Sequence, residues 1–173
     1  MKSKPIQLSA NSYALLALLN HLGEATSYDI KQALEVSIEN FWPLPHTTAY
    51  EEPARLAAGG YLSVRQETGG RRRKRYLLTE QGRAALAAWT AEPSAAPPQL
   101  RDEAMLKVFA GAEPEPLLGA RIAWHQAKLE ELEGYLSAVR EIGDWTGGER
   151  ALIAGVTYHR QILKMMGGLG EPS

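Results

Sequence analysis

Five basic side chains stand side by side at residues 71–75, and we call them the basic run: Arg71, Arg72, Arg73, Lys74 and Arg75. The whole chain of 173 residues carries a formal net charge of only −1. Like charges at consecutive positions repel one another, so such a run either stays in solvent or neutralises a polyanionic partner. The chemistry that it offers is phosphate binding, and the alternative is a charged loop exposed to water.

A second group of polar side chains lies at the start of a predicted helix, where each can donate or accept hydrogen bonds: His46, Thr47, Thr48 and Tyr50. Arg55 lies five residues past Tyr50 in the same helix. A helix N-terminus carries partial positive charge, which suits a phosphate group. The alternative roles are helix caps and turns for the residues before Tyr50. Arg55 can face phosphate or pair with Glu51 or Glu52.

Three helices are predicted to position these side chains. The first covers residues 9–22 and ends at Gly23. The second begins at Thr26, which forms a capping box with Asp29, and its Tyr28 and Lys31 are further candidates for phosphate contact. The third ends at Gly59 and Gly60. An interior proline removes a helical hydrogen bond, so Pro53 either kinks this helix or lies in the first turn of its regular part.

Two short strands follow the third helix. Residues 61–66 alternate apolar and polar side chains, residues 75–79 form a second strand, and Gly69 and Gly70 turn the chain between them. This β-hairpin places the basic run at its tip and on its returning edge. Thr79 is a candidate N-cap of a fourth helix. Three helices followed by a hairpin form the winged helix arrangement, so Arg71, Arg72, Arg73 and Lys74 are expected to contact DNA.

The chain is predicted to contain two domains of opposite charge. Residues 1–89 hold 11 Lys and Arg against 8 Asp and Glu, whereas residues 90–173 hold 8 against 12. Prolines interrupt the helical pattern at residues 91–100. We therefore expect a winged helix DNA-binding domain at residues 1–90, a linker at 91–100 and a helical domain at 101–173. The predicted fold class is mainly α with a small β-hairpin.

The second half contains two heptad patterns, in residues 118–142 and 149–166, which are typical of coiled-coil helices. Two such patterns predict more apolar surface than one pair of helices buries, and hence a dimerisation module. The predicted dimer contacts are the apolar residues of these patterns: Leu118, Ile122, Leu129, Leu132, Leu136, Val139, Leu152, Val156 and Leu163.

Two histidines, His125 and His159, interrupt these patterns. Antiparallel packing about the intervening loop is expected to bring His125 near Met166 and His159 near Leu132, so that the histidines do not face each other within one chain. A metal site would then need a ligand from a second copy. Polar residues that fix the helix register are the preferred explanation.

Enzyme motifs and cofactor sites are not found. The sequence contains no G-x-S-x-G, P-loop or H-E-x-x-H pattern and no cysteine. We expect no catalysis, no cofactor and no bound metal. No apolar run is long enough to cross a membrane, and the start of the chain lacks the apolar core of a signal peptide, so a cytoplasmic protein is expected. Trp89 and Trp124 are candidates for binding an aromatic effector, with a core role as the alternative.

The order of these segments resembles the PadR family of bacterial transcriptional regulators along almost the whole chain. The resemblance lies in YALLALLNHLGEATSYDIKQAL, FWPLPHTTAYEEPARLAAGGYLS, GGRRRKRYLLTEQGRAAL and RDEAMLKVFAG. Many members have a proline directly after the tyrosine of the recognition helix, whereas here Glu51 follows Tyr50 and the proline is Pro53.

The resemblance implies a homodimer that binds double-stranded DNA at an inverted repeat. It also implies a repressor that a small molecule, for instance an aromatic compound, releases from the operator. Two alternatives stay open from the sequence. One is a winged helix adaptor that binds proteins, and the other is a small-molecule-binding protein that does not bind DNA.

Overall fold

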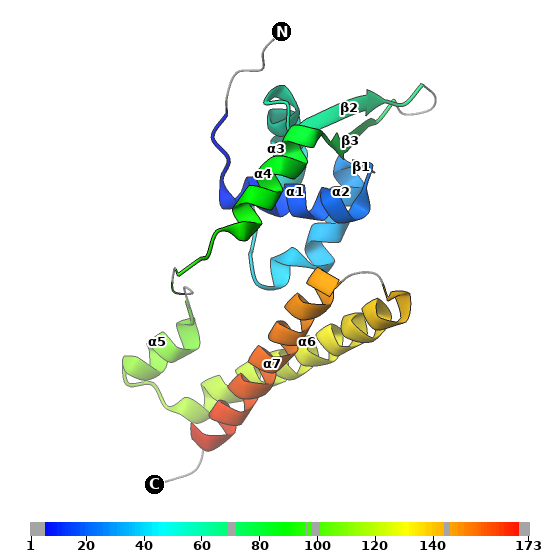
Figure 1. Ribbon diagram of the computed structural model, residues 1–173. Coiled ribbons are helices and arrows are strands. Elements are labelled where there is room, and N and C mark those ends of the chain that lie inside the picture. The colour runs from blue at the N-terminus through cyan, green and yellow to red at the C-terminus, as the bar shows by residue number, and fades with distance from the viewer. Residues whose placement is uncertain (1–5, 69–71, 96, 98–100, 144–145, 170–173) are drawn as a thin grey trace. The chain divides into compact units, whose positions relative to one another are not determined.

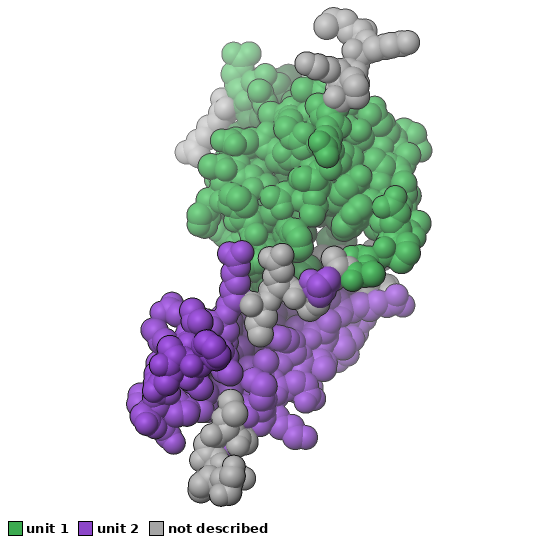
Figure 2. Space-filling view, turned by 90° about the vertical axis from the view of Figure 1, so that its left-hand side faces the viewer, with its two compact units in different colours: residues 1–95 green, residues 96–173 purple. Residues whose placement is uncertain are grey.

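The computed structural model describes residues 6–68, 72–95, 97, 101–143 and 146–169. The chain divides into two compact units, unit 1 with residues 1–95 and unit 2 with residues 96–173 (Figure 2). Gly69, Gly70 and Arg71, which the sequence places in the predicted turn of the hairpin, lie outside the described residues.

Unit 1 contains helices followed by a small sheet, and Figure 1 shows their arrangement. Its elements are, in chain order, α1 (Ala10–Leu22), β1 (Ala25–Thr26), α2 (Ser27–Val36), η1 (Ile38–Asn40), α3 (Thr48–Ala58), β2 (Leu62–Gln66), β3 (Lys74–Leu78) and α4 (Glu80–Ala91). The predicted helices and both predicted strands are present, with ends shifted by a residue or two.

Side-chain caps fix the starts of three of these helices. The hydroxyl of Thr26 accepts from the Asp29 amide, and the Asp29 carboxylate accepts from the Thr26 amide, which is the predicted capping box. Thr79 caps α4 in the predicted way, through a bond from the Gly82 amide. Ser9 caps α1 and forms a second capping box with Ser12. Each cap satisfies amides that a helix start leaves without a partner.

The sheet has three antiparallel strands in the order β1-β3-β2. We call residues 62–78, which include β2, β3 and their connection, the wing. The hairpin of the wing was predicted, but the short strand β1 was not. Ala25 pairs with Tyr76 and Thr26 with Arg75, so the start of α2 is hydrogen-bonded to the base of the wing.

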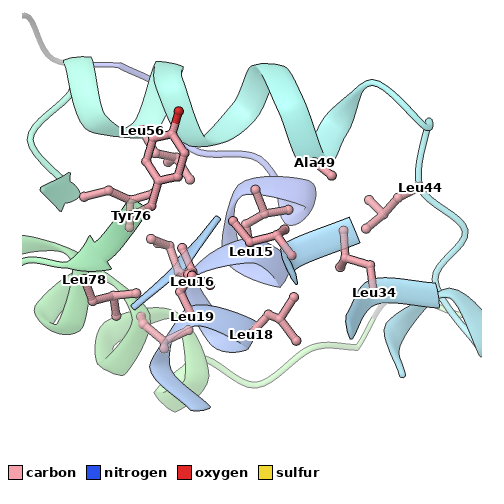
Figure 3. Close-up of a cluster of buried hydrophobic side chains, with 14 residues drawn as sticks. Leu15, Leu16, Leu18, Leu19, Leu34, Leu44, Ala49, Leu56, Tyr76 and Leu78 are labelled. Atoms are coloured by element: carbon pink, nitrogen blue, oxygen red, sulfur yellow. The ribbon is translucent and has the colours of Figure 1, made fainter. Parts of the chain in front are cut away.

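The core of unit 1 lies between the helices and the sheet. Helix α1 contributes more of its buried side chains than any other element, and these pack against side chains of α2, α3 and the wing (Figure 3). Leu15, Leu16 and Leu56 are 0% exposed, and Tyr76 of β3 is 3% exposed. Burial of apolar side chains of this size contributes about 1.5–3 kcal/mol each. This core therefore holds α3 and the wing on one scaffold.

Helix α3 begins at Thr48 and continues through Pro53 to Ala58. The alternative in which Pro53 lies in the first turn of the helix is wrong, because α3 begins at Thr48 and Pro53 is an interior residue. The proline ring is fully buried in the core. Apolar burial of the ring offsets part of the cost of the missing N–H donor.

Unit 2 is helical in its described residues. It contains α5 (Glu103–Phe109), α6 (Pro114–Ile142) and α7 (Thr146–Leu169). Helices α6 and α7 form a hairpin whose apolar cluster contains Leu132, Leu136, Leu152 and Val156. These four side chains are thus buried within one chain. Of the other predicted dimer contacts, Leu118 is buried and the rest are half-buried: Ile122, Leu129, Val139 and Leu163.

The expected separation of His125 and His159 is wrong. Their Nδ1 atoms lie 2.8 Å apart, and both rings are buried. Leu132 faces Gly155, one helical turn before His159, and a Cβ on Gly155 would lie 3.2 Å from the Leu132 Cδ1 atom. Opposite His125, α7 presents His159 in place of the expected Met166, a shift of seven residues or about two turns. That shift brings the two imidazoles together.

The predicted fold class, mainly α with a winged helix and a helical second unit, is confirmed. Within the described ranges, none of the helices has the length and apolar character needed to cross a membrane.

Candidate nucleic-acid interface

The exposed side of α3 carries Tyr50, whose side chain is 52% exposed. His46 and Thr47 precede the helix and are also exposed, whereas Thr48 is buried. Thr47 makes no side-chain capping bond, although its carbonyl accepts from the amides of Tyr50 and Glu51. The imidazole of His46 and the hydroxyls of Thr47 and Tyr50 are therefore available to a partner, whereas the hydroxyl of Thr48 is not.

Helix α2 contributes one exposed aromatic side chain and one paired cation. Tyr28, in the first turn, is 55% exposed. The ammonium of Lys31 lies 2.5 Å from the Glu35 carboxylate. An exposed pair of this kind contributes little to stability, so Lys31 can exchange Glu35 for a phosphate at small cost.

Arg55 is held by groups of its own unit. Its guanidinium donates from Nε and Nη2 to the Glu52 carboxylate at 2.7 and 2.6 Å, and from Nη1 to the Gln7 carbonyl at 3.0 Å. Nη2 also lies 2.8 Å from the hydroxyl of Ser12, which donates to Glu52 at 2.6 Å. These bonds join α3 to α1 and to the segment before it. Of the two predicted alternatives for Arg55, this geometry favours pairing with Glu52.

The same network explains why two adjacent glutamates are tolerated in α3. Glu51 points to solvent, but the Glu52 side chain is only 14% exposed. Burial raises the pKa of Glu52, and the hydrogen bonds from Arg55 and Ser12 outweigh it, so that its pKa lies below the ordinary value. The negative charge of Glu52 is thus neutralised within the fold.

Replacing Arg55 with alanine is expected to lower the free energy of unfolding by about 2 kcal/mol. The change leaves the Glu52 carboxylate with Ser12 as its remaining hydrogen-bond partner. We take the low end of the range for charged pairs because Arg55 is 39% exposed. Urea denaturation of Arg55→Ala measures the effect, and Glu51→Ala is the matched control, with a change below about 0.5 kcal/mol. Equal midpoints for the two variants would show that the network does not stabilise α3.

The wing carries the described part of the basic run, and two of its arginines are bound within the wing. The Glu67 carboxylate accepts from Arg75 Nε at 2.9 Å and from Arg73 Nε at 3.3 Å. The bond from Arg75, together with the positive charge and the one bond of Arg73, holds the pKa of Glu67 below its ordinary value. At the base of the wing, Arg65 makes a two-pronged pair with Glu24 at 2.8 and 2.5 Å.

The remaining two described cations of the basic run are Arg72 and Lys74. Both are exposed, and within the described part of the chain neither side chain has an ion-pair partner. Arg72 has a positive φ of 49°, so its backbone turns in the left-handed region at the returning end of the wing connection. Gln66 donates to the Arg72 carbonyl at 3.0 Å. These two side chains combine exposure with uncompensated positive charge.

The described tryptophans make defined contacts. Trp89 stacks on Tyr13 with ring centroids 4.7 Å apart, and Trp42 donates to Asn11 at 2.9 Å. Trp124 is 51% exposed and contacts the edge of His125. Stacking occupies one face of Trp89, whereas Trp124 keeps more of its ring accessible.

Sequence reasoning missed Ser12 as a partner of Arg55 and Glu24 as a partner of Arg65. Each of these bonds joins residues more than 30 positions apart, and a local pattern carries no signal of that kind.

Comparison with known proteins identifies the family. The sequence model of the Transcriptional regulator PadR-like family matches residues 15–88. The Negative transcriptional regulator PadR of Bacillus subtilis (strain 168) is 31% identical over 129 residues, which cover 70% of each chain. Members of this family are transcriptional regulators, so the expectation that the chain is not an enzyme is confirmed.

Solved structures show the same fold over nearly the whole chain. Bacillus subtilis PadR in complex with operator DNA superposes with a TM-score of 0.80 at 24% identity, covering 93% of this chain and 97% of that one. The same protein in complex with p-coumaric acid gives 0.74 at 22% identity, covering 94% and 96%. The match in sequence and the match in fold agree, and the chain belongs to the PadR-like family of transcriptional regulators.

Proposed function

We propose that this regulator is a homodimeric repressor that acts in the cytoplasm and binds an inverted-repeat operator through unit 1. The observation that carries the proposal is the wing, where Arg72 and Lys74 are exposed and have no ion-pair partner among the described residues. When unpaired cations of this kind bind DNA phosphates, they displace counterions that were condensed on the DNA. Arg71, outside the described residues, and Arg73, which Glu67 already engages, are weaker candidates.

Recognition of the operator is assigned to α3 and its flanks. Tyr50, His46 and Thr47 are exposed at the start of that helix, and Tyr28 is exposed on α2. Contacts to phosphates position a protein on DNA, whereas contacts to base edges specify the sequence. We assign Tyr50 and His46 to the bases and Tyr28 to the backbone. Arg55 acts by holding α3, and Lys31 is a secondary phosphate contact.

Self-association is assigned to unit 2. The α6–α7 hairpin already buries part of the apolar residues of the two heptad patterns. The contact with a second copy must therefore use other apolar surface. Leu106 is 64% exposed and Phe109 is 89% exposed on α5, and Ile142 is 76% exposed at the end of α6. Exposed apolar side chains of this size are typical of interfaces. Of the residues in the heptad patterns, the half-buried Ile122 and Leu163 can contribute to the same contact with a second copy.

The related Bacillus subtilis protein is named a negative regulator and has been crystallised with operator DNA and with p-coumaric acid. These facts support the repressor assignment and a small aromatic effector for this chain. Trp124, which is half exposed in unit 2, is the better candidate for contact with an effector, because Tyr13 covers one face of Trp89.

Fluorescence anisotropy with the intergenic DNA beside the coding sequence tests the function. We expect binding by two chains per site, with an affinity that falls steeply as salt increases. Light scattering on the free protein should give twice the chain mass of 19.0 kDa. Absence of binding at any salt would favour the adaptor, and binding of an aromatic compound without DNA binding would favour a small-molecule-binding protein.

A further inference from the structure

The α6–α7 hairpin contains a pair of buried histidines that DNA binding does not use. His125 is 1% exposed and His159 is 5% exposed. Their Nδ1 atoms are 2.8 Å apart, and the ring centroids are 5.0 Å apart. At this distance one ring must donate an N–H to the lone pair of the other, because two lone pairs or two N–H groups would repel.

The surroundings of the pair decide which ring donates. Nε2 of His125 is buried and has no hydrogen-bond partner among the described residues. A buried N–H without an acceptor is less tolerated than a buried lone pair without a donor. His125 therefore carries its proton on Nδ1 and donates it to His159. His159 then keeps its own proton on Nε2.

Adding one more proton to this pair of neutral histidines is unfavourable at either available nitrogen atom. The remaining basic atom is Nε2 of His125, which would become a buried N–H for which the described part of the chain offers no acceptor. Protonating Nδ1 of His159 instead would remove the lone pair that accepts the bond. Either event breaks the pairing or buries an unsatisfied charge, and both outcomes are costly.

The charged groups around the pair oppose protonation as well. Arg121 and Lys128 of α6 act on His125 and His159, respectively, and raise the positive potential there. Asp102, the N-cap of α5, has the opposite effect on His125. Its carboxylate is engaged by Arg121 and by the Ala104 amide at 3.0 Å, so it is not available as an acceptor for His125.

Aromatic rings complete the enclosure of the pair. Trp124 of α6 packs its ring edge-to-face against His125 at 4.8 Å, and Tyr158 of α7 packs in the same way against His159 at 5.2 Å. Among the described residues, no third metal-binding side chain joins the histidines, because no group of three or more His, Cys, Asp or Glu gathers anywhere. Proton binding is thus favoured over metal binding.

We propose that the His125–His159 pair is a proton-sensing site, at which proton uptake in mildly acidic conditions breaks the bond between the rings and loosens the α6–α7 hairpin. The proposed function assigns self-association to unit 2. On that basis, acidification also weakens the dimer and releases DNA. The loosening of the hairpin itself does not depend on that assignment.

The direction of the pH effect follows from proton linkage. Burial lowers the pKa of His125, with His159 and Arg121 adding repulsion, and burial also lowers the pKa of His159. A histidine in the unfolded chain titrates near about 6.5. Below that pH the unfolded state binds more protons than the folded state, so the folding equilibrium constant decreases as pH falls. Each histidine contributes up to about tenfold per pH unit.

Denaturant unfolding of the full chain at pH 7.5, 6.5 and 5.5 tests the proposal. The key variant is the double substitution His125→Leu with His159→Leu, which keeps the apolar pattern of the hairpin and removes both titrating groups. We expect the wild type to lose at least tenfold in the folding equilibrium constant of unit 2 between pH 6.5 and 5.5. The double variant should be nearly constant over this range. His21→Gln, in unit 1, should behave like the wild type.

The pH range is kept above 5 so that carboxylates do not contribute. Glu52, for example, has a lowered pKa and titrates in more acidic conditions. Identical pH profiles for the wild type and the double variant would overturn the proposal. So would zinc ions that raise the unfolding midpoint of the wild type at pH 7.5 without affecting the double variant, because the pair would then be a metal site.

Nitrogen-detected NMR of the imidazoles keeps the proposal testable if the double variant does not fold. We expect His125 as the neutral Nδ1–H tautomer at pH 6.5, with protonation only at a pH below the ordinary pKa of histidine. A charged His125 at pH 6.5 would overturn the proposal. Because unfolding and NMR do not involve DNA, a protein that fails to bind its promoter yet shows this behaviour refutes only the proposed function.

Discussion

Alanine at both Arg72 and Lys74 is expected to weaken promoter binding about 100-fold at 0.15 M salt and to flatten the salt dependence of the affinity. A dimer carrying these changes lacks four wing charges. Each phosphate contact contributes about 0.9 to the slope of log affinity against log salt, so the slope should become less negative by about 2 to 4. Fluorescence anisotropy at several salt concentrations measures both quantities.

The control for this experiment removes the same number of charges elsewhere. Arg83 pairs with Glu80 on α4, and Lys107 pairs with Glu103 on α5. The double variant Arg83→Ala with Lys107→Ala changes the net charge equally but leaves the wing intact. If both double variants lower the slope by the same amount, the effect is one of overall charge, and the wing does not contact phosphate.

The largest loss of stability is expected from Gly82→Ala, with a decrease of about 3 kcal/mol in the free energy of unfolding. A Cβ at this position would lie 2.2 Å from the Tyr61 carbonyl oxygen and 3.2 Å from its carbon. These are backbone atoms, so no side-chain rotation relieves the overlap. The same carbonyl accepts from the Thr79 amide at 3.1 Å and from its hydroxyl at 3.0 Å, which ties the start of α4 to the start of β2.

Chemical denaturation compares this variant with Glu80→Ala. Glu80 lies in the same helical turn and its side chain is 90% exposed. Its replacement should change the free energy of unfolding by less than about 1 kcal/mol, through the helix dipole and one exposed ion pair. Comparable stabilities of the two variants would mean that α4 can move away from Tyr61 at little cost.

Patterns among residues close in sequence were sufficient to predict where most helices and strands of unit 1 begin and end. The capping box of Thr26 and Asp29, the N-cap Thr79 and the alternation in the wing each depend on residues close in sequence. Strand β1 was not predictable in this way, because its two residues, Ala25 and Thr26, form a strand only by pairing with β3. A single strand of that length has no periodicity.

Contacts between distant residues limited the prediction of the site. Arg55 had two possible roles from sequence, and its bond to Ser12 across 43 residues depends on how α3 packs on α1. The pairing of His125 with His159 depends on the register between α6 and α7, in which Leu132 lies against Gly155. A heptad pattern indicates which face of a helix is buried, but it does not determine which turn of the partner helix lies opposite.

The position of Glu67 between two arginines allows a single substitution to change the charge that the wing presents. Its one carboxylate holds the guanidinium groups of both Arg73 and Arg75, while its backbone amide donates to the Arg73 carbonyl at 3.0 Å. Exchange of Glu67 for a neutral residue would free two cations in a single step and leave that backbone bond in place. In the proposed complex with DNA, a substitution at this one codon would therefore change the affinity for the operator without altering any residue assigned to the bases.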